Sequence, residues 1–193
     1  VLVFMDNSVR NRWIIAGIVI VGILLSSILF SVPEGRVAVV TLFGKPVRTY
    51  KTAGLKFKLP LPFEQAHIFD ARKRVSKTRL TETLTKDKRN IVLVTYSVWQ
   101  IDDPERFMKA VWSIDGAEQK LDGLITNAKN AVMGNYDFSA LVSEQGEAQR
   151  IDDIEGDMLA DVREEAQNRY GISVRQIGIQ RIALPEENIR YVF

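Results

Sequence analysis

The chain has 193 residues, with 26 basic side chains, 24 acidic side chains, one histidine and no cysteine. The lack of cysteine excludes disulfides, thiolate metal sites and cysteine nucleophiles. One histidine without cysteine is also too little for a common zinc site.

An uncharged stretch of 21 residues, 13–33, follows a short tail at 1–12. Its core spans about 27 Å as a helix, close to the hydrocarbon thickness of a bilayer. The run is apolar all round and has no A-x-A-like cleavage site after it, which argues against a buried core helix and a signal peptide. Basic residues flank it on both sides, so charge leaves its orientation open. The sequence predicts a transmembrane anchor at 13–32, formed by Trp13, Ile14, Ile15, Ile18, Val19, Ile20, Val21, Ile23, Leu24, Leu25, Ile28, Leu29 and Phe30.

Residues 34–101 read as a β-rich subdomain. Strands are expected at 36–43, at 47–50 and, most clearly, at 91–101, where β-branched and aromatic residues dominate. Between them an alternating strand leads into a loop with two prolines. The apolar residues of this segment either dip into the bilayer interface or pack under the first hairpin, and the sequence leaves both readings open. These possible membrane-interface residues are Leu55, Phe57, Leu59, Leu61 and Phe63.

Residues 102–184 read as an α/β subdomain. The first helix is expected to begin at Pro104 after the N-cap Asp103, the second to run from about 115 to 134, and the third from about 143 to 170, with Gly171 as its C-cap. The second and third helices each carry an apolar stripe, formed by Leu121, Leu124, Ile125, Ala128 and Val132 and by Ile151, Ile154, Met158, Val162, Ala166 and Tyr170. Residues 172–184 are extended, and a shift of apolar parity after Val174 predicts a bulge or a strand buried on both faces. A further helix begins at 185–193, and we expect it to continue beyond Phe193.

Charge is unevenly distributed along the chain. Residues 45–90 hold 13 basic and 4 acidic side chains, whereas residues 144–170 hold 9 acidic and 3 basic ones. A solvated helix face is the ordinary interpretation of the acidic block. A second hypothesis is that the acidic face of one copy meets the basic β-rich subdomain of the next, in a contact that closes into rings. The possible inter-subunit acidic face is Asp153, Asp157 and Asp161.

No motif for catalysis or cofactor binding stands out. His67 lies in a short strand without a G-x-S-x-G elbow elsewhere, and no glycine-rich phosphate loop is present in the sequence. A carboxylate-based hydrolase would need two carboxyl groups converging in one pocket, and no pair has motif-grade spacing. We therefore predict a protein that is not an enzyme and has no catalytic residues, cofactor or metal.

Several short motifs occur in a specific order along the chain. They are VPEG at 32–35, TLFGK at 41–45, GLKFKLP at 54–60, FDAR at 69–72, LTKD at 84–87, DP at 103–104 and YGI at 170–172 with LP at 184–185. In this order they resemble the SPFH or band 7 family, which includes stomatin, prohibitin, flotillin and the bacterial HflK and HflC proteins. Within that family the chain is most similar to the HflC branch.

The resemblance implies an α+β fold, in which a transmembrane helix precedes an SPFH domain with a β-rich and an α/β subdomain. It implies a single-pass protein of the bacterial inner membrane with its main domain in the periplasm. It also implies a non-enzymatic scaffold that oligomerises with an HflK-like subunit into a ring or cage and regulates the membrane AAA+ protease FtsH. The alternative is a stomatin-like or flotillin-like membrane-microdomain scaffold with its domain on the cytoplasmic side. Both readings imply membrane lipids and protein subunits as partners, and no nucleic acid.

Overall fold

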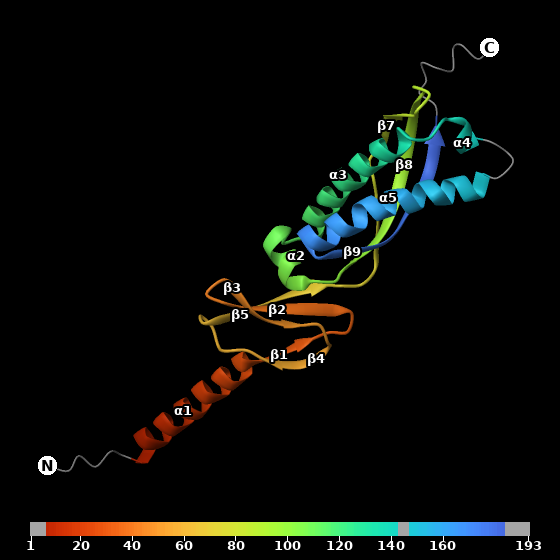
Figure 1. Ribbon diagram of the computed structural model, residues 1–193. Helices are drawn as coiled ribbons and strands as arrows, with labels where there is room; N and C mark the ends of the chain where they lie inside the picture. Colours follow the sequence, from red (N-terminus) through yellow and green to blue (C-terminus); the bar gives the residue numbers. More distant parts are fainter. Residues whose placement is uncertain (1–6, 143–146, 184–193) are drawn as a thin grey trace. The chain divides into compact units, whose positions relative to one another are not determined.

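The computed structural model describes residues 7–142 and 147–183 (Figure 1). It divides into two compact units, Val1–Asp70 and Ala71–Phe193. The expected helix at 185–193 and the expected start of the third helix at 143 lie outside the described residues. Unit 1 contains α1 (Asn7–Ile28), β1 (Leu29–Val32), β2 (Arg36–Leu42), β3 (Lys45–Tyr50), β4 (Gly54–Phe57) and β5 (Glu64–Asp70).

The first helix of unit 1 ends earlier than predicted. α1 stops at Ile28, and Leu29 and Phe30 belong to strand β1, so the predicted helical anchor is wrong at its C-terminal end. The cause is pairing: β1 forms an antiparallel ladder with β4, in which Leu29 lies opposite Phe57. Pairing satisfies the backbone groups of these residues outside a helix. Among the described residues, no helix meets the length and apolarity expected of a membrane span.

A three-stranded sheet of order β3-β2-β5 forms the core of unit 1. β2 lies between two antiparallel neighbours, and its run Val37–Val40 is buried on both faces. This explains why the strand reads as continuously β-branched rather than alternating. β2 and β3 are joined by Phe43 and Gly44, both with positive φ.

Unit 2 is built on a four-stranded antiparallel sheet with α-helices. Strand β8 pairs with β6 and β7 along one edge and with β9 along the other. Its elements are β6 (Arg74–Lys77), β7 (Thr81–Leu84), β8 (Asn90–Ile101), α2 (Pro104–Ala110), α3 (Ile114–Met133), α4 (Ser139–Val142), α5 (Glu147–Tyr170) and β9 (Ile172–Ala183).

The boundary between the two units differs from the predicted one at 101/102. It falls between Asp70 and Ala71, because β8 pairs with β9 along nearly its full length and so joins residues 71–101 to the α/β part of the chain. The sequence reading grouped these strands with the earlier ones by composition. Strand pairing across a long connection is not visible in that local pattern.

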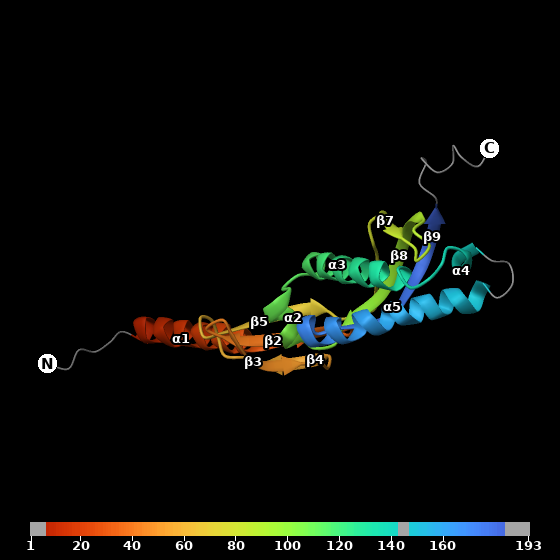
Figure 2. The ribbon, with the colours of Figure 1, turned by 45° about the horizontal axis from the view of Figure 1, so that its top comes forward.

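Helices α3 and α5 lie side by side along the sheet, as both views show (Figures 1 and 2). Leu121 and Ile125 of α3, with Ile154 and Met158 of α5, are nearly or fully buried, and so is Trp99 of β8. They form one core between the helices and the sheet. The predicted apolar stripes of both helices are confirmed by this burial.

The structure of unit 2 contains the helix cap and the strand bulge that its sequence predicts. The Asp103 side chain accepts the backbone N–H of Arg106 and caps α2, as predicted. β9 carries a register shift between Val174 and Gln176, which confirms the predicted bulge. Gly171 has φ of +67° and ends α5, and a Cβ at this position would lie 2.4 Å from the Asp103 carbonyl oxygen.

One ionisable side chain lies in the core of unit 2. Lys129 of α3 is fully buried, and its Nζ donates a hydrogen bond to the Thr81 hydroxyl of β7. Burial lowers the pKa of Lys129 from its ordinary value of 10.5, and the nearby Asp122 carboxylate opposes this only in part. The charged form is therefore held in the fold at a cost in desolvation.

This burial predicts a pH dependence of stability. The pKa of Lys129 is lower in the folded chain than in the unfolded chain, so the unfolded chain binds more protons. The free energy of unfolding should thus rise as pH increases toward 10.5. Lys129→Met should remove this dependence and stabilise the protein by about 1–2 kcal/mol near neutral pH. Urea unfolding of the detergent-solubilised chain, followed by circular dichroism at several pH values, measures both effects. Lys120→Met, at an exposed position of the same helix, is the control, and equal behaviour of the two variants would contradict the prediction.

Candidate functional site

The most conspicuous surface of unit 1 is a group of large apolar side chains that are not buried. The predicted interface residues are all among them, with exposures from 49% to 66%, so they do not pack under the first hairpin. Two further residues extend the group: Phe43, which was not predicted as a site residue, and Leu29, which was predicted as part of the anchor. We call this group the apolar rim: Leu29, Phe43, Leu55, Phe57, Leu59, Leu61 and Phe63.

The apolar rim is tied to the end of α1. The backbone N–H of Lys58 donates to the carbonyl oxygen of Ile28, the last residue of the helix, over 2.8 Å. Leu29 lies opposite Phe57 in the β1–β4 ladder. Since the rim starts where the helix ends, any surface that α1 enters also lies next to the rim.

A buried carboxylate holds the loop 58–63 in place. Glu64 is only 5% exposed, and its Oε2 accepts the backbone N–H of Leu59 at 2.7 Å and pairs with the Arg48 guanidinium. Residue 64 closes the loop at the start of β5, opposite Leu42 of β2. Two donors satisfy this buried carboxylate, and its hydrogen bond to Leu59 fixes the backbone of the exposed apolar loop.

Phe43 stands at the tip of the β2–β3 hairpin in a conformation that does not suit it. Its φ is +47° and Gly44 follows with +82°, the pattern of a type I′ turn, which favours asparagine and glycine. The left-handed region costs an L-residue about 1–2 kcal/mol. The Phe43 ring is 72% exposed and packs edge-on against Phe63, with 6.1 Å between the ring centroids. A strained, exposed aromatic residue is better explained by binding than by folding.

The predicted acidic face lies on α5 in unit 2. Asp153, Asp157 and Asp161 are all exposed. Their surroundings differ: the Tyr136 hydroxyl donates to Asp157 over 2.8 Å, a contact that raises the pKa of Tyr136. Asp161 lines a groove, and Asp153 is the nearest of the three to the N-terminus of α5. One member of the set therefore has an internal partner that the sequence did not reveal.

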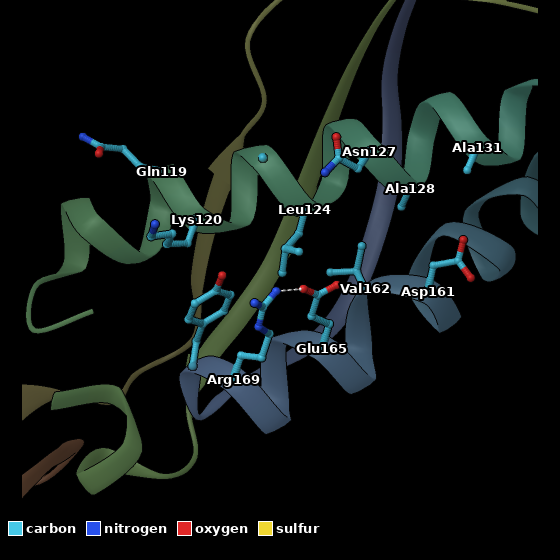
Figure 3. A pocket seen from close by; sticks show the side chains of 12 residues that line it. Gln119, Lys120, Leu124, Asn127, Ala128, Ala131, Asp161, Val162, Glu165 and Arg169 are labelled. Carbon is cyan, nitrogen blue, oxygen red and sulfur yellow. Dashed lines mark hydrogen bonds and ion pairs between the residues drawn. The ribbon is translucent and has the colours of Figure 1, made fainter. Parts of the chain in front are cut away.

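The groove beside Asp161 runs between α3 and α5 and has a volume of about 560 Å³. Figure 3 shows Leu124 of α3 and Val162 of α5 pointing toward one another, with the Arg169–Glu165 ion pair beside them. Much of the α3 wall consists of small or neutral residues, Gly123, Asn127, Ala128 and Ala131. The groove is shallow, and its paired charges are not arranged as a nucleophile with a base.

A second strained aromatic residue lies in unit 2. Trp112 follows the C-cap of α2, has φ of +66° and is 56% exposed. Its backbone N–H donates a hydrogen bond to the carbonyl oxygen of Phe107. Glycine is the usual residue at such a helix end. The sequence offered no signal for this position beyond a large aromatic residue between two helices.

The LTKD motif at 84–87 forms a structural clasp rather than a binding site. The Asp87 carboxylate accepts the Thr85 hydroxyl and, at 3.0 Å, the backbone N–H of Phe138. These bonds, led by that of Thr85, lower the pKa of Asp87. The Arg89 guanidinium lies 5.2 Å from the centre of the Phe138 ring. The clasp joins the β7–β8 turn to the segment before α4, which accounts for this motif without a ligand.

His67, the single histidine, lies in β5 opposite Val39. Its Nε2 is 3.3 Å from the Thr41 hydroxyl. These contacts place it within the sheet of unit 1.

Known proteins are similar in sequence to both units of this chain. Residues 30–193 match the family model described as SPFH domain / Band 7 family. A protein named HflC from Vibrio cholerae is 28% identical over 92% of this chain and 64% of its own length. HflC from Vibrio parahaemolyticus is 28% identical over 82% of this chain and 58% of its length. A protein of Escherichia coli K12 named modulator of FtsH protease HflC is 29% identical over 69% of this chain.

The chain spans less than two thirds of the length of these curated relatives. The match to the family model, in contrast, covers most of the chain, including both the unit 1 sheet and all of unit 2. It also confirms the resemblance drawn from the ordered motifs. This protein therefore belongs to the SPFH/band 7 family.

Proposed function

We propose that this protein is a membrane-anchored, non-enzymatic scaffold that assembles side by side with other subunits and modulates a membrane AAA+ protease of the FtsH type. The observation that carries the proposal is the apolar rim, which adjoins the end of α1. The curated relatives named HflC support the proposed role, since one of them is named as a modulator of FtsH protease. An HflK-like subunit is the proposed partner in the ring or cage.

The proposed anchor is α1 with the uncharged run 13–33. Among its described side chains, Trp13, Ile15 and Ile18 are more than half exposed, which suits lipid contact rather than a protein core. A bacterial inner-membrane location with the main domain in the periplasm is part of the proposal and follows the HflC resemblance.

The apolar rim is the proposed second membrane contact. In this proposal the rim side chains leave water and insert at the boundary between lipid headgroups and acyl chains, while Lys56 and Lys58 extend toward anionic headgroups. The strain at Phe43 supports this function because the aromatic ring lengthens the rim at the hairpin tip. Burial of several such side chains, at about 25 cal/mol per Å² of apolar surface, easily exceeds the strain of one left-handed residue.

This proposal predicts different environments for the turn before strand β4 and for the loop after it. The chain lacks cysteine, so Leu61→Cys and Ala53→Cys can each carry a single nitrobenzoxadiazole label. In vesicles, the label at 61 should emit at shorter wavelength and be quenched by lipid-borne nitroxides. The label at 53, in the exposed turn at the other end of β4, is the matched control and should remain in water.

Phe43→Asn tests the function of the strained residue in the same assay. Asparagine suits the left-handed turn, so this variant should be more stable by about 1 kcal/mol and yet show weaker quenching at 61. Equal quenching at 61 and 53, or a Phe43→Asn variant that loses stability without any change in quenching, would rule out membrane contact by the rim.

The proposed protease association predicts co-isolation. The affinity-tagged full chain, extracted from its native membranes in mild detergent, should bring down a membrane AAA+ metalloprotease and an SPFH relative, identified by mass spectrometry. A tagged variant with Leu59, Leu61 and Phe63 changed to serine should be recovered equally well but carry less of both. Recovery of the wild-type chain with neither protein would contradict the proposed function.

A further inference from the structure

One face of the unit 2 sheet carries no helix among the described residues. Helices α3 and α5 pack on the opposite face, where Leu93 and Trp99 of β8 are fully buried. The alternate residues of β8 between 94 and 98 are only half-buried. We call their surface, with its cross-strand neighbours on β6 and β9, the open sheet face: Val75, Lys77, Val94, Tyr96, Val98, Gln176 and Arg181.

The centre of the open sheet face consists of valines and of Tyr96, whose hydroxyl accepts a hydrogen bond from Gln176, and each flanking strand carries one basic residue. Val75 of β6 is 62% exposed, an unusual exposure for a valine within a strand. Tyr96 lies across Gly178, where an added Cβ would come within 2.4 Å of the ring, so no side chain rises from β9 there. Lys77 and Arg181 are exposed on the two strands that flank β8. An apolar centre with charge at the sides is typical of a surface that packs against another layer.

The other side of unit 2 presents the complementary charge. On α5, Asp153 and Asp161 are exposed, and Gly156 and Ala160 lie between them on the outer surface of the helix. A Cβ added at Gly156 would meet no atom within 4 Å, so the helix backbone is open to close approach there. Gly156 and Ala160, between the two aspartates, are small, so another surface can approach the helix backbone closely there.

The spacing of the charges matches across the two faces. Asp153 and Asp161 are eight residues apart on one helix, which places them about 12 Å apart along its axis. Lys77 and Arg181 lie on strands two positions apart and are offset by two residues, which also gives about 12 Å. Two pairs of opposite charge can therefore form at once between the two faces.

We propose that unit 2 docks a second copy of this chain head to tail, the open sheet face of one copy covering the acidic face of α5 in the next. The inference rests on the proposed scaffold function and names the surfaces that carry its assembly. Because the two faces lie on opposite sides of one sheet-and-helix layer pair, the contact is heterologous, and repetition closes a ring or extends a row. The charge pairs select register and partner, and the valine surface supplies the buried area.

Charge reversal tests the pairing directly. In the full chain in mild detergent, Lys77→Glu with Arg181→Glu should weaken self-association at least about tenfold, as should Asp153→Lys with Asp161→Lys. Asp157 is left unchanged because it accepts the Tyr136 hydroxyl. All four changes in one chain should restore association. Sedimentation velocity across a concentration series measures the apparent dissociation constant, and Lys86→Glu with Lys88→Glu, the same charge change in the β7–β8 turn, should leave it unchanged.

Mixing the two double variants distinguishes a heterologous contact from a two-fold one. In an equimolar mixture every sheet face of one variant meets an oppositely charged α5 face of the other, so alternating copies should associate and grow as the wild-type chain does, whereas a two-fold contact would stop at dimers. Both variants should keep the circular dichroism spectrum of the wild-type chain. Association that survives both reversals, or a mixture that stays monomeric, would overturn the proposed surfaces while leaving the scaffold function standing. A wild-type chain that stays monomeric at all concentrations would overturn docking between copies, whereas the scaffold function fails only if the co-isolation experiment also recovers no partner.

Discussion

Strand β8 pairs with β9 from Ile101–Ile172 to Val92–Ala183, and the organisation of unit 2 follows from that ladder. The pairing brings the end of α5 back onto the first half of the unit and buries one face of the sheet beneath α3 and α5. Within the described ranges 7–142 and 147–183, no helix covers the other face. A two-layer structure of this kind has one sheet surface and one helix surface turned outward. Their chemistry differs: the sheet surface is apolar and basic, and the helix surface is acidic.

Unit 1 has a small core, a short run of β2 between two strands, and a large exposed apolar surface. The buried Glu64 carboxylate and the strained Phe43 show that this exposure is built into the fold: one fixes the loop, and the other extends the rim against its own backbone preference. Isolated water-exposed domains seldom keep such a surface. A lipid boundary next to α1 would remove the cost of its exposure.

The sequence predicted best what depends on local chemistry. The Asp103 cap, the glycine at 171 and the apolar stripes of α3 and α5 were read from neighbouring residues, and the structure confirms them. It predicted poorly what depends on distant pairing. The β1–β4 ladder ends α1 at Ile28, and the β8–β9 ladder places the unit boundary at 70/71. In both ladders the paired strands are far apart in the sequence, so the residues around either strand do not reveal its partner.

The candidate surfaces divide in the same way. Alternation and prolines pointed to the loop 55–63, and charge counting pointed to α5. Phe43 and Trp112 were missed because their significance lies in a positive φ, which a composition-based reading does not provide. The open sheet face was missed because its members come from three strands that are far apart in the sequence. Only the register of β6, β8 and β9 brings them together.

Head-to-tail contact between copies is the central claim, and cysteine cross-linking tests it most directly because the chain has no cysteine of its own. A chain carrying both Lys77→Cys and Asp153→Cys should form, on mild oxidation in membranes, a ladder of disulfide-linked multimers. A mixture of the two single variants should give only the mixed dimer. Dimers formed by either single variant alone, with no mixed product, would contradict a head-to-tail arrangement.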